Sequence, residues 1–320
     1  TGMMGKLSSA ASGIGKGLGA AASAGAAVAT AVGGAAVATG TFAVNSAVSL
    51  DKALNGLAAS TGASTDEMEE YETVLKKVYA NNYGENFQSI ADTMAVVRQQ
   101  MSGISDTDMQ TLTEAAFAFE DISGYSPEES LRVANSLMNQ FGVTAEEAYN
   151  LMVQGQQQGL DFSGELLDSI NEYAPQFEKM GFSAEDMFNI FKSGAESGAF
   201  NLDKIGDAVK ENAIRVIDLS ESTTNAFTAL GLDASQMASE FGAGGETAEK
   251  AFQKVMVGLQ SIEDPVKRNQ IGTALWGTMW EDLGETVILS SADMTDSFDQ
   301  TADSMKKVQD VKYDDLGSMF

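Results

Sequence analysis

Residues 142–147 read Gly-Val-Thr-Ala-Glu-Glu, and residues 181–186 read Gly-Phe-Ser-Ala-Glu-Asp. In each stretch the glycine suits the left-handed position that ends one helix, because it has no Cβ to clash there. The hydroxyl of Thr144 or Ser183 can accept a backbone N–H of the following helix, and the acid three residues later can complete a capping box. Both stretches therefore predict two helices joined by a short turn.

The same pattern recurs elsewhere along the chain. Residues 231–236 read Gly-Leu-Asp-Ala-Ser-Gln, and residues 124–129 place a proline, Pro127, at the first helical position, where its missing N–H costs nothing. Turns of one type at several places indicate a series of sharply connected helices. The predicted turn and cap positions are Gly142, Thr144, Gly181, Ser183, Gly231 and Asp233.

Apolar residues recur at intervals of three and four between these turns, which places them on one face of a helix. Runs that alternate with the period of a strand are scarce. We therefore predict an all-α fold without a sheet, in which stacked helical hairpins form an elongated domain. Two of the apolar series are Leu166, Ile170, Tyr173, Phe177 and Met180, and Ala248, Ala251, Phe252, Val255, Met256 and Leu259.

The beginning of the chain has a different composition. Residues 1–50 contain Lys6 and Lys16 but no acid, and residues 17–50 carry no charge and consist mainly of Ala, Gly, Val, Ser and Thr. As a helix this uncharged stretch would be about 51 Å long, which exceeds the ~30 Å of a bilayer core and allows one membrane span. Small residues suit close helix packing equally well, so a packed leader helix stays an alternative. The membrane-candidate positions are Ala20, Val28, Val32, Val37, Phe42, Val44 and Val48.

Composition changes at about residue 50, and from Asp51 onward acids, glutamine, methionine and phenylalanine occur at helical spacing. We predict an apolar Gly/Ala-rich leader helix in residues 1–50, a helical domain in 51–290, and an acidic helical or linker segment in 291–320. Because the chain begins at Thr1 and stops without a helix cap, we expect it to be part of a longer protein.

The residue counts exclude several classes of function. The chain has no cysteine and no histidine, so it lacks thiolate chemistry, the commonest general base and the commonest metal ligand. Its formal net charge of -27 repels phosphate, which argues against binding nucleic acid. The sequence shows no catalytic, cofactor or metal site, and we predict a protein that is not an enzyme.

Residues 263–284 hold both tryptophans of the chain and form its most distinctive segment. They combine an acid-proline start, a helix of small residues, and the run Trp-Gly-Thr-Met-Trp-Glu-Asp-Leu-Gly. This segment resembles the end of the core domain of phage tail tape-measure proteins, and the Ala/Gly leader followed by a helical core matches that family's order of parts. The family-motif residues, which we predict to serve packing, are Trp276, Gly277, Thr278, Trp280, Glu281, Asp282 and Gly284.

The resemblance implies a structural protein of the virion. Such a protein would lie in the lumen of the growing tail, template its length, and leave ahead of the DNA, passing into the host envelope. The partners implied are the tail-tube protein, tail assembly chaperones, tail-tip or distal tail proteins, the host membrane, and further copies in a homo-oligomer, for which a trimer is one candidate. The alternative from another class is a membrane-inserting or pore-forming helical protein that is not tied to a tail.

Overall fold

The computed structural model describes residues 36–292 and 297–311 of the chain. Within these ranges it contains sixteen helices and no strand, which confirms the all-α prediction. The first eight are α2 (Ala36–Thr61), α3 (Thr65–Ala80), α4 (Phe87–Gln100), α5 (Asp106–Ser123), α6 (Pro127–Phe141), α7 (Ala145–Gln157), α8 (Leu166–Lys179) and α9 (Ala184–Glu196). The next eight are α10 (Leu202–Arg215), α11 (Glu221–Ala229), α12 (Ala234–Ala243), α13 (Gly245–Gln260), α14 (Pro265–Trp276), α15 (Met279–Leu283), α16 (Glu285–Ser290) and α17 (Ser304–Gln309).

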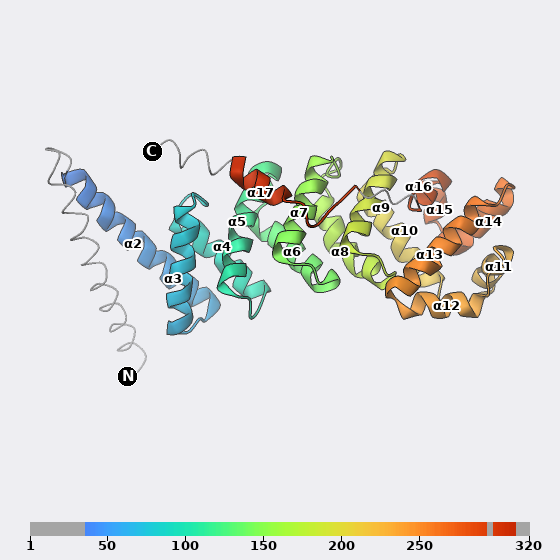
Figure 1. Cartoon of the computed structure of the whole chain (residues 1–320), viewed down its shortest axis with the longest axis horizontal. Coiled ribbons are helices and arrows are strands. Elements are labelled where there is room, and N and C mark those ends of the chain that lie inside the picture. The colour runs from blue at the N-terminus through green and yellow to red at the C-terminus, as the bar shows by residue number, and fades with distance from the viewer. Residues whose placement is uncertain (1–35, 293–296, 312–320) are drawn as a thin grey trace.

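Consecutive helices alternate between two layers of an elongated stack (Figure 1). Helices α2, α4, α6, α8 and α10 pack against one another in that order, and so do α3, α5, α7 and α9. A hairpin of two amphipathic helices cannot bury its apolar faces alone, and stacking on the next hairpin completes the burial. The chain therefore advances along the long axis of the molecule one hairpin at a time.

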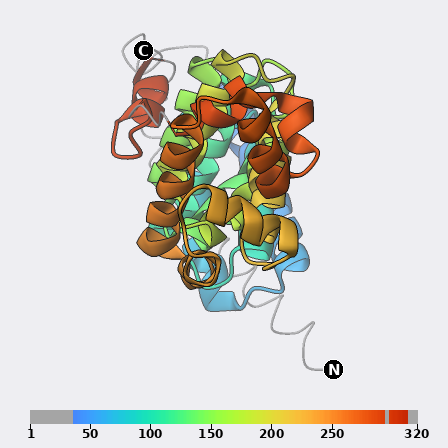
Figure 2. The same cartoon turned by 90° about the vertical axis from the view of Figure 1, so that its right-hand side faces the viewer.

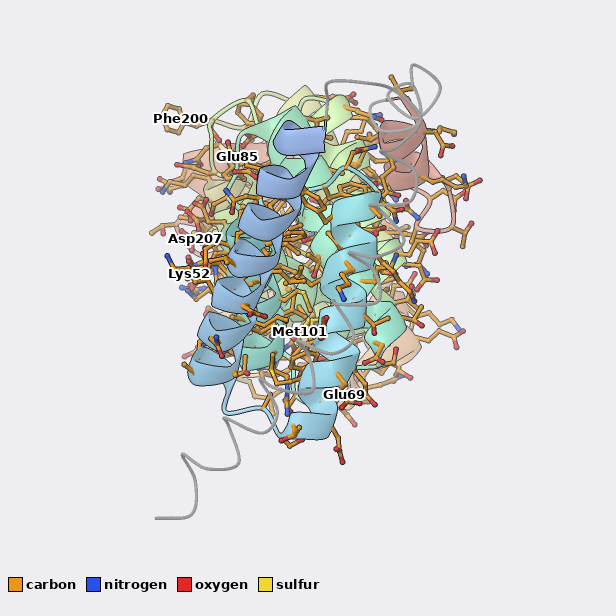
Figure 3. All side chains as sticks on the ribbon, turned by 90° about the vertical axis from the view of Figure 1, so that its left-hand side faces the viewer. Lys52, Glu69, Glu85, Met101, Phe200 and Asp207 are labelled. Atoms are coloured by element: carbon orange, nitrogen blue, oxygen red, sulfur yellow. The ribbon has the colours of Figure 1, made fainter. Side chains whose placement is uncertain are left out.

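One continuous apolar core runs along the stack. Its members include the stripe of Val74, Leu75 and Val78 on α3 and the stripe of Ile170 and Phe177 on α8, all of them buried. At the end of the stack that α2 and α3 form, Lys52 and Glu69 are exposed whereas Met101 is buried (Figure 3). The apolar face of each helix thus points to its neighbours and the charged face points to solvent.

The regular alternation stops after α10. Helix α14 packs against α10 and α11, and the short helices α15 and α16 contact α10 and α9 respectively. Helices α12 and α13 meet at Gly244 and Gly245, where positive φ angles of 69° and 56° turn the chain sharply. Helices α11 to α16 therefore close the end of the stack opposite α2 and α3 (Figure 1).

The last described segment runs back along the stack. Residue 297 lies beside α9, and α17 packs against α5 and α7 near the middle of the molecule. Figure 2, which views the stack from the end with α11 to α14, shows α17 on the outside of the helical layers. We call residues 297–311 the strap.

Helix α2 passes through residue 50 without a break, so the change in composition there is not a break in secondary structure. Among the described residues, no helix combines the length and the apolar character that crossing a membrane requires. Residues 1–35, which hold most of the predicted leader, lie outside the described ranges.

Candidate functional site

The turn between α6 and α7 contains the first quoted motif. Gly142 has φ 70°, and its N–H donates to the Met138 carbonyl at 3.0 Å. Thr144 Oγ1 accepts the Glu147 N–H at 3.2 Å, while the Glu147 carboxylate accepts the Thr144 N–H at 2.7 Å. One residue thus ends α6, and two side chains satisfy the first N–H groups of α7.

The turn between α8 and α9 has the same caps and an additional contact. The N–H of Phe182 donates to the Phe177 carbonyl at 3.1 Å, and Ser183 and Asp186 form the capping box. Gly181 has φ 87°, and a Cβ built on it would lie 2.0 Å from the carbonyl oxygen of Gly245. This glycine therefore allows both the turn and the close approach of the α12–α13 junction.

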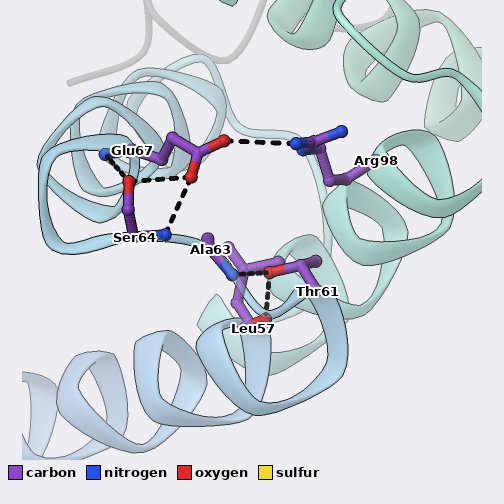
Figure 4. Close-up of polar contacts among 6 residues, drawn as sticks. All are labelled: Leu57, Thr61, Ala63, Ser64, Glu67 and Arg98. Atoms are coloured by element: carbon purple, nitrogen blue, oxygen red, sulfur yellow. Dashed lines mark hydrogen bonds and ion pairs between the residues drawn. The ribbon is translucent and has the colours of Figure 1, made fainter.

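The remaining turns follow the same chemistry. Gly231 has φ 76°, and Asp233 accepts the Gln236 N–H at 2.7 Å. Between α2 and α3, Ser64 and Glu67 form a capping box, and Arg98 of α4 donates to the same glutamate at 3.2 Å (Figure 4). The hydrogen bonds from Ser64 and then Arg98 lower the pKa of the Glu67 carboxyl, so the capping box keeps its charge to a lower pH than an unpaired glutamate would.

Replacing Ser183 by alanine is expected to lower the free energy of unfolding by about 1 kcal/mol, because an orphan N–H of α9 loses its acceptor. Thr278→Ala is the matched control, since Thr278 occupies the N-cap of α15 but makes no capping hydrogen bond with its side chain. Urea denaturation followed by far-UV circular dichroism measures both. Equal losses in the two variants would contradict the cap assignment.

The two tryptophans lie in the core. Trp276 at the end of α14 is 2 % exposed and Trp280 in α15 is 1 % exposed, with ring centroids 6.0 Å apart. Trp276 also contacts Phe252 of α13, whose ring packs edge-on against Phe182 after α8. A chain of aromatic rings therefore joins the closing helices α13 to α15 to the regular part of the stack.

The Trp280 indole has a defined pocket. Its Nε1–H donates to Asn269 Oδ1 at 2.5 Å. A Cβ on Gly272 would lie 2.2 Å from the indole ring, so the glycine leaves the space that the ring fills. The ring is therefore held by shape on one side and by a hydrogen bond on the other.

Gly277 and its surroundings fix the turn between α14 and α15. Gly277 has φ 59°, and a Cβ there would lie 2.7 Å from Glu211 and 2.8 Å from Arg215, both on α10. The buried amide of Asn212 on α10 donates to the Leu275 carbonyl at 3.0 Å. Helix α10 thus holds the end of α14 through polar contacts as well as packing.

The polar residues of the tryptophan segment face outward. Thr278, Glu281 and Asp282 are exposed, and Asp282 forms an ion pair with Lys204 of α10 at 3.1 Å. Gly284 has φ 81° and donates its N–H to the Trp280 carbonyl at 3.2 Å, which ends α15. The segment combines a buried aromatic side with an exposed acidic side.

One tyrosine has a strongly perturbed environment. The Tyr173 hydroxyl donates to Asp203 at 2.8 Å and Asp207 at 3.0 Å. Burial and then these two carboxylates raise the pKa of the Tyr173 hydroxyl, so it stays a protonated donor that joins α8 to α10. Among the described residues, no group of three acidic side chains is close enough to hold a metal ion.

Four of the seven membrane-candidate positions fall within the described residues. Val48 on α2 is 55 % exposed. The backbone of Val37, Phe42 and Val44 belongs to α2. The other three positions, Ala20, Val28 and Val32, lie outside the described residues.

The model of the family described as phage-related minor tail protein matches residues 76–277, from the end of α3 to the end of α14. This is more than half of the chain. The chain belongs to this family. The match ends at Gly277, so it includes Trp276 but not Trp280 or the acidic residues that follow.

Two curated relatives are similar to this member of the minor tail protein family. The probable tape measure protein of Streptomyces phage phiC31 is 30% identical over 188 residues, which are 54% of this chain and 26% of the relative. The uncharacterized protein YqbO of Bacillus subtilis strain 168 is 29% identical over 215 residues, 66% of this chain and 14% of the relative. The chain therefore spans about a quarter or less of the length of these relatives. No solved structure matches it.

The chain also has a row of amide side chains bonded to the strap, which the sequence analysis missed. Along α7, the amides of Asn150, Gln154 and Gln158 donate to the main-chain carbonyls of strap residues Gln300 (3.0 Å), Asp299 (2.7 Å) and Ser297 (3.0 Å). The three amides are spaced by four residues, so they lie in a row on one helical face. This spacing of the amides was the sequence signal that could have indicated a binding face, but the same spacing also fits a helix face exposed to solvent.

The strap's N–H groups are bonded as well. Asn189 on α9 accepts the Ser297 N–H at 3.1 Å, Gln154 accepts the Asp299 N–H at 3.0 Å, and Glu185 on α9 accepts the Gln300 N–H at 2.8 Å. Further along, Asn150 accepts the Met305 N–H at 2.9 Å. We call the face of α7 and α9 that makes these bonds the amide groove.

Proposed function

We propose that this chain is the core segment of a tail tape-measure protein, which occupies the tail-tube lumen, templates tail length during assembly and leaves ahead of the DNA. The family match over residues 76–277 carries this proposal. The similarity to the phiC31 protein supports it. An elongated stack of helices also suits a structural role in the virion.

The charge of the chain supports a position in a conduit that DNA later uses. With a formal net charge of -27, the chain has no electrostatic affinity for the phosphate backbone and would not hold the DNA back. The partners in this proposal are the tail-tube protein, tail assembly chaperones, tail-tip or distal tail proteins and further copies of the chain.

Removing α5 to α8 (residues 106–179) in frame from the full-length protein is expected to shorten the phage tail. If these residues form one continuous helix in the lumen, the loss is about 110 Å at ~1.5 Å per residue. If they keep their stacked form, with helices about 10 Å apart in each layer, the loss is about 20 Å. Electron microscopy of many particles distinguishes the two values.

The control for this deletion is Glu281→Ala, which changes one exposed side chain and is expected to leave tail length unchanged. Tails of normal length in the deletion phage would refute the templating role. Failure to make any tails would be resolved by a second deletion of α5 and α6 alone.

We further propose that residues 17–50 insert into the host membrane after ejection. A peptide of residues 1–50 is expected to become helical on anionic vesicles and release a trapped dye, because its uncharged part is long enough to span and its two lysines favour an anionic surface. The Val28→Asp, Val37→Asp double variant should lose this activity. Intact vesicles with the wild-type peptide would leave the packed-leader interpretation in its place.

A further inference from the structure

The strap binds the amide groove mainly through its main chain. Ser297, Asp299 and Gln300 each donate an N–H and each have their carbonyl bonded by an amide of α7. A side-chain amide carries both a donor and an acceptor, so one residue can bond an N–H and a C=O of the same strap residue, as Gln154 does with Asp299. The groove therefore binds the main chain of residues 297–300, which precede α17 and lie outside any helix.

Two buried side chains of the strap set the register. Phe298 is 4 % exposed, and its ring packs 5.3 Å from that of Phe188 on α9. Met305 is 3 % exposed and belongs to α17, which packs against α5 and α7. The ligand that fits this groove is thus a short non-helical segment with an aromatic anchor, followed by a turn and a helix that carries a second apolar anchor seven residues later.

With the strap in place, Asn150, Gln154 and Asn189 are 2 %, 9 % and 4 % exposed, so the strap both covers these amides and bonds them. If the strap of one chain leaves, another segment of the same chemistry can make these contacts in its place. Every copy of this chain carries such a segment, and an exchange between two copies makes the same contacts that it breaks.

We propose that the strap is exchangeable and that the amide groove of one copy binds residues 297–311 of a second copy. The proposal rests on the contacts between strap and groove and does not depend on the role in a tail. The exchanged and unexchanged forms contain the same strap–groove contacts, so they differ mainly in the entropy cost of bringing two chains together. A high local concentration lowers that cost and therefore favours the exchanged form.

The chain has no cysteine, so two introduced thiols report on the exchange without background. Gln158→Cys in an unlabelled chain marks the groove, and Ser297→Cys in an isotope-labelled full chain marks the strap. These positions are close, because the wild-type Gln158 side chain donates to the Ser297 carbonyl at 3.0 Å. The two variants are mixed in urea, refolded together at several concentrations and treated with a short bis-maleimide. Mass spectrometry identifies the cross-link between unlabelled and labelled chains, and a chain with both substitutions verifies the geometry.

We expect a cross-link between copies whose yield rises with protein concentration. Adding Phe298→Ala and Met305→Ala to the groove-marked copy weakens its own strap, and should raise the yield by about tenfold; adding them to the strap-marked copy should lower it by about tenfold. Opposite effects of the same two substitutions are specific to strap exchange. Circular dichroism verifies that each variant folds.

The control pairs Ser297→Cys with Asn225→Cys, an exposed position on α11 far from the groove, and gives the collision background. A yield that stays at this background at every concentration, while the doubly substituted chain cross-links internally, would overturn the proposal. The proposal would also be overturned if the cross-link yield exceeds background but the two anchor substitutions change it equally in either copy. The copies would then touch at a place other than the strap and the groove.

Discussion

Replacing Trp280 by alanine is expected to lower the free energy of unfolding by about 3–5 kcal/mol, the usual cost of removing a fully buried tryptophan. The indole is 1 % exposed and fills the space beside Gly272. Its removal also leaves Asn269 Oδ1 without its donor at 2.5 Å and takes away a ring contact of Trp276. Urea denaturation of the full chain, followed by far-UV circular dichroism, measures the loss.

Two further variants separate the contributions to this loss. Trp280→Phe keeps most of the ring but removes the Nε1–H, so its loss should be smaller than that of Trp280→Ala. Thr278→Ala lies two residues away on the exposed side of the segment and should stay within about 0.5 kcal/mol of the wild type. A loss below about 1 kcal/mol for Trp280→Ala would show that the ring does not stabilise the closing end of the stack.

The local features of this fold follow from short stretches of sequence. A glycine followed by a capping residue and an acid specifies where one helix ends and the next begins, and the interactions involved span only a few residues. The apolar spacing of three and four likewise fixes which face of each helix is buried. The helix bounds at Gly142 and Ser183 are cases of this kind.

The features that required the structure depend on residues far apart in the chain. Gln154 meets Asp299 only because α17 returns to the middle of the stack, and nothing near Gln154 in sequence specifies that return. A row of amides on a helix reads the same whether it faces water or another segment. Likewise, the sequence identifies Trp280 as a large apolar residue but does not show that Gly272 provides its space.

Gly181→Ala is expected to lower the free energy of unfolding by about 2–5 kcal/mol, for two reasons that act together. A Cβ at φ 87° costs roughly 1–2 kcal/mol in the left-handed region. The same Cβ would lie 2.0 Å from the carbonyl oxygen of Gly245, and such overpacking typically costs about 1–3 kcal/mol more. Because the clashing atom belongs to the backbone, a change of rotamer cannot relieve it.

Gly142→Ala separates the two reasons, since Gly142 occupies the same turn motif with φ 70° but has no atom within 4 Å of its added Cβ. This variant should show the conformational cost alone, about 1 kcal/mol after the smaller entropy of the unfolded alanine chain is taken into account. Urea denaturation of both variants gives the difference directly. Equal losses would mean that the α8–α9 turn can move away from Gly245 at no cost, and then the contact between the turn and the α12–α13 junction does not hold the closing helices to the stack.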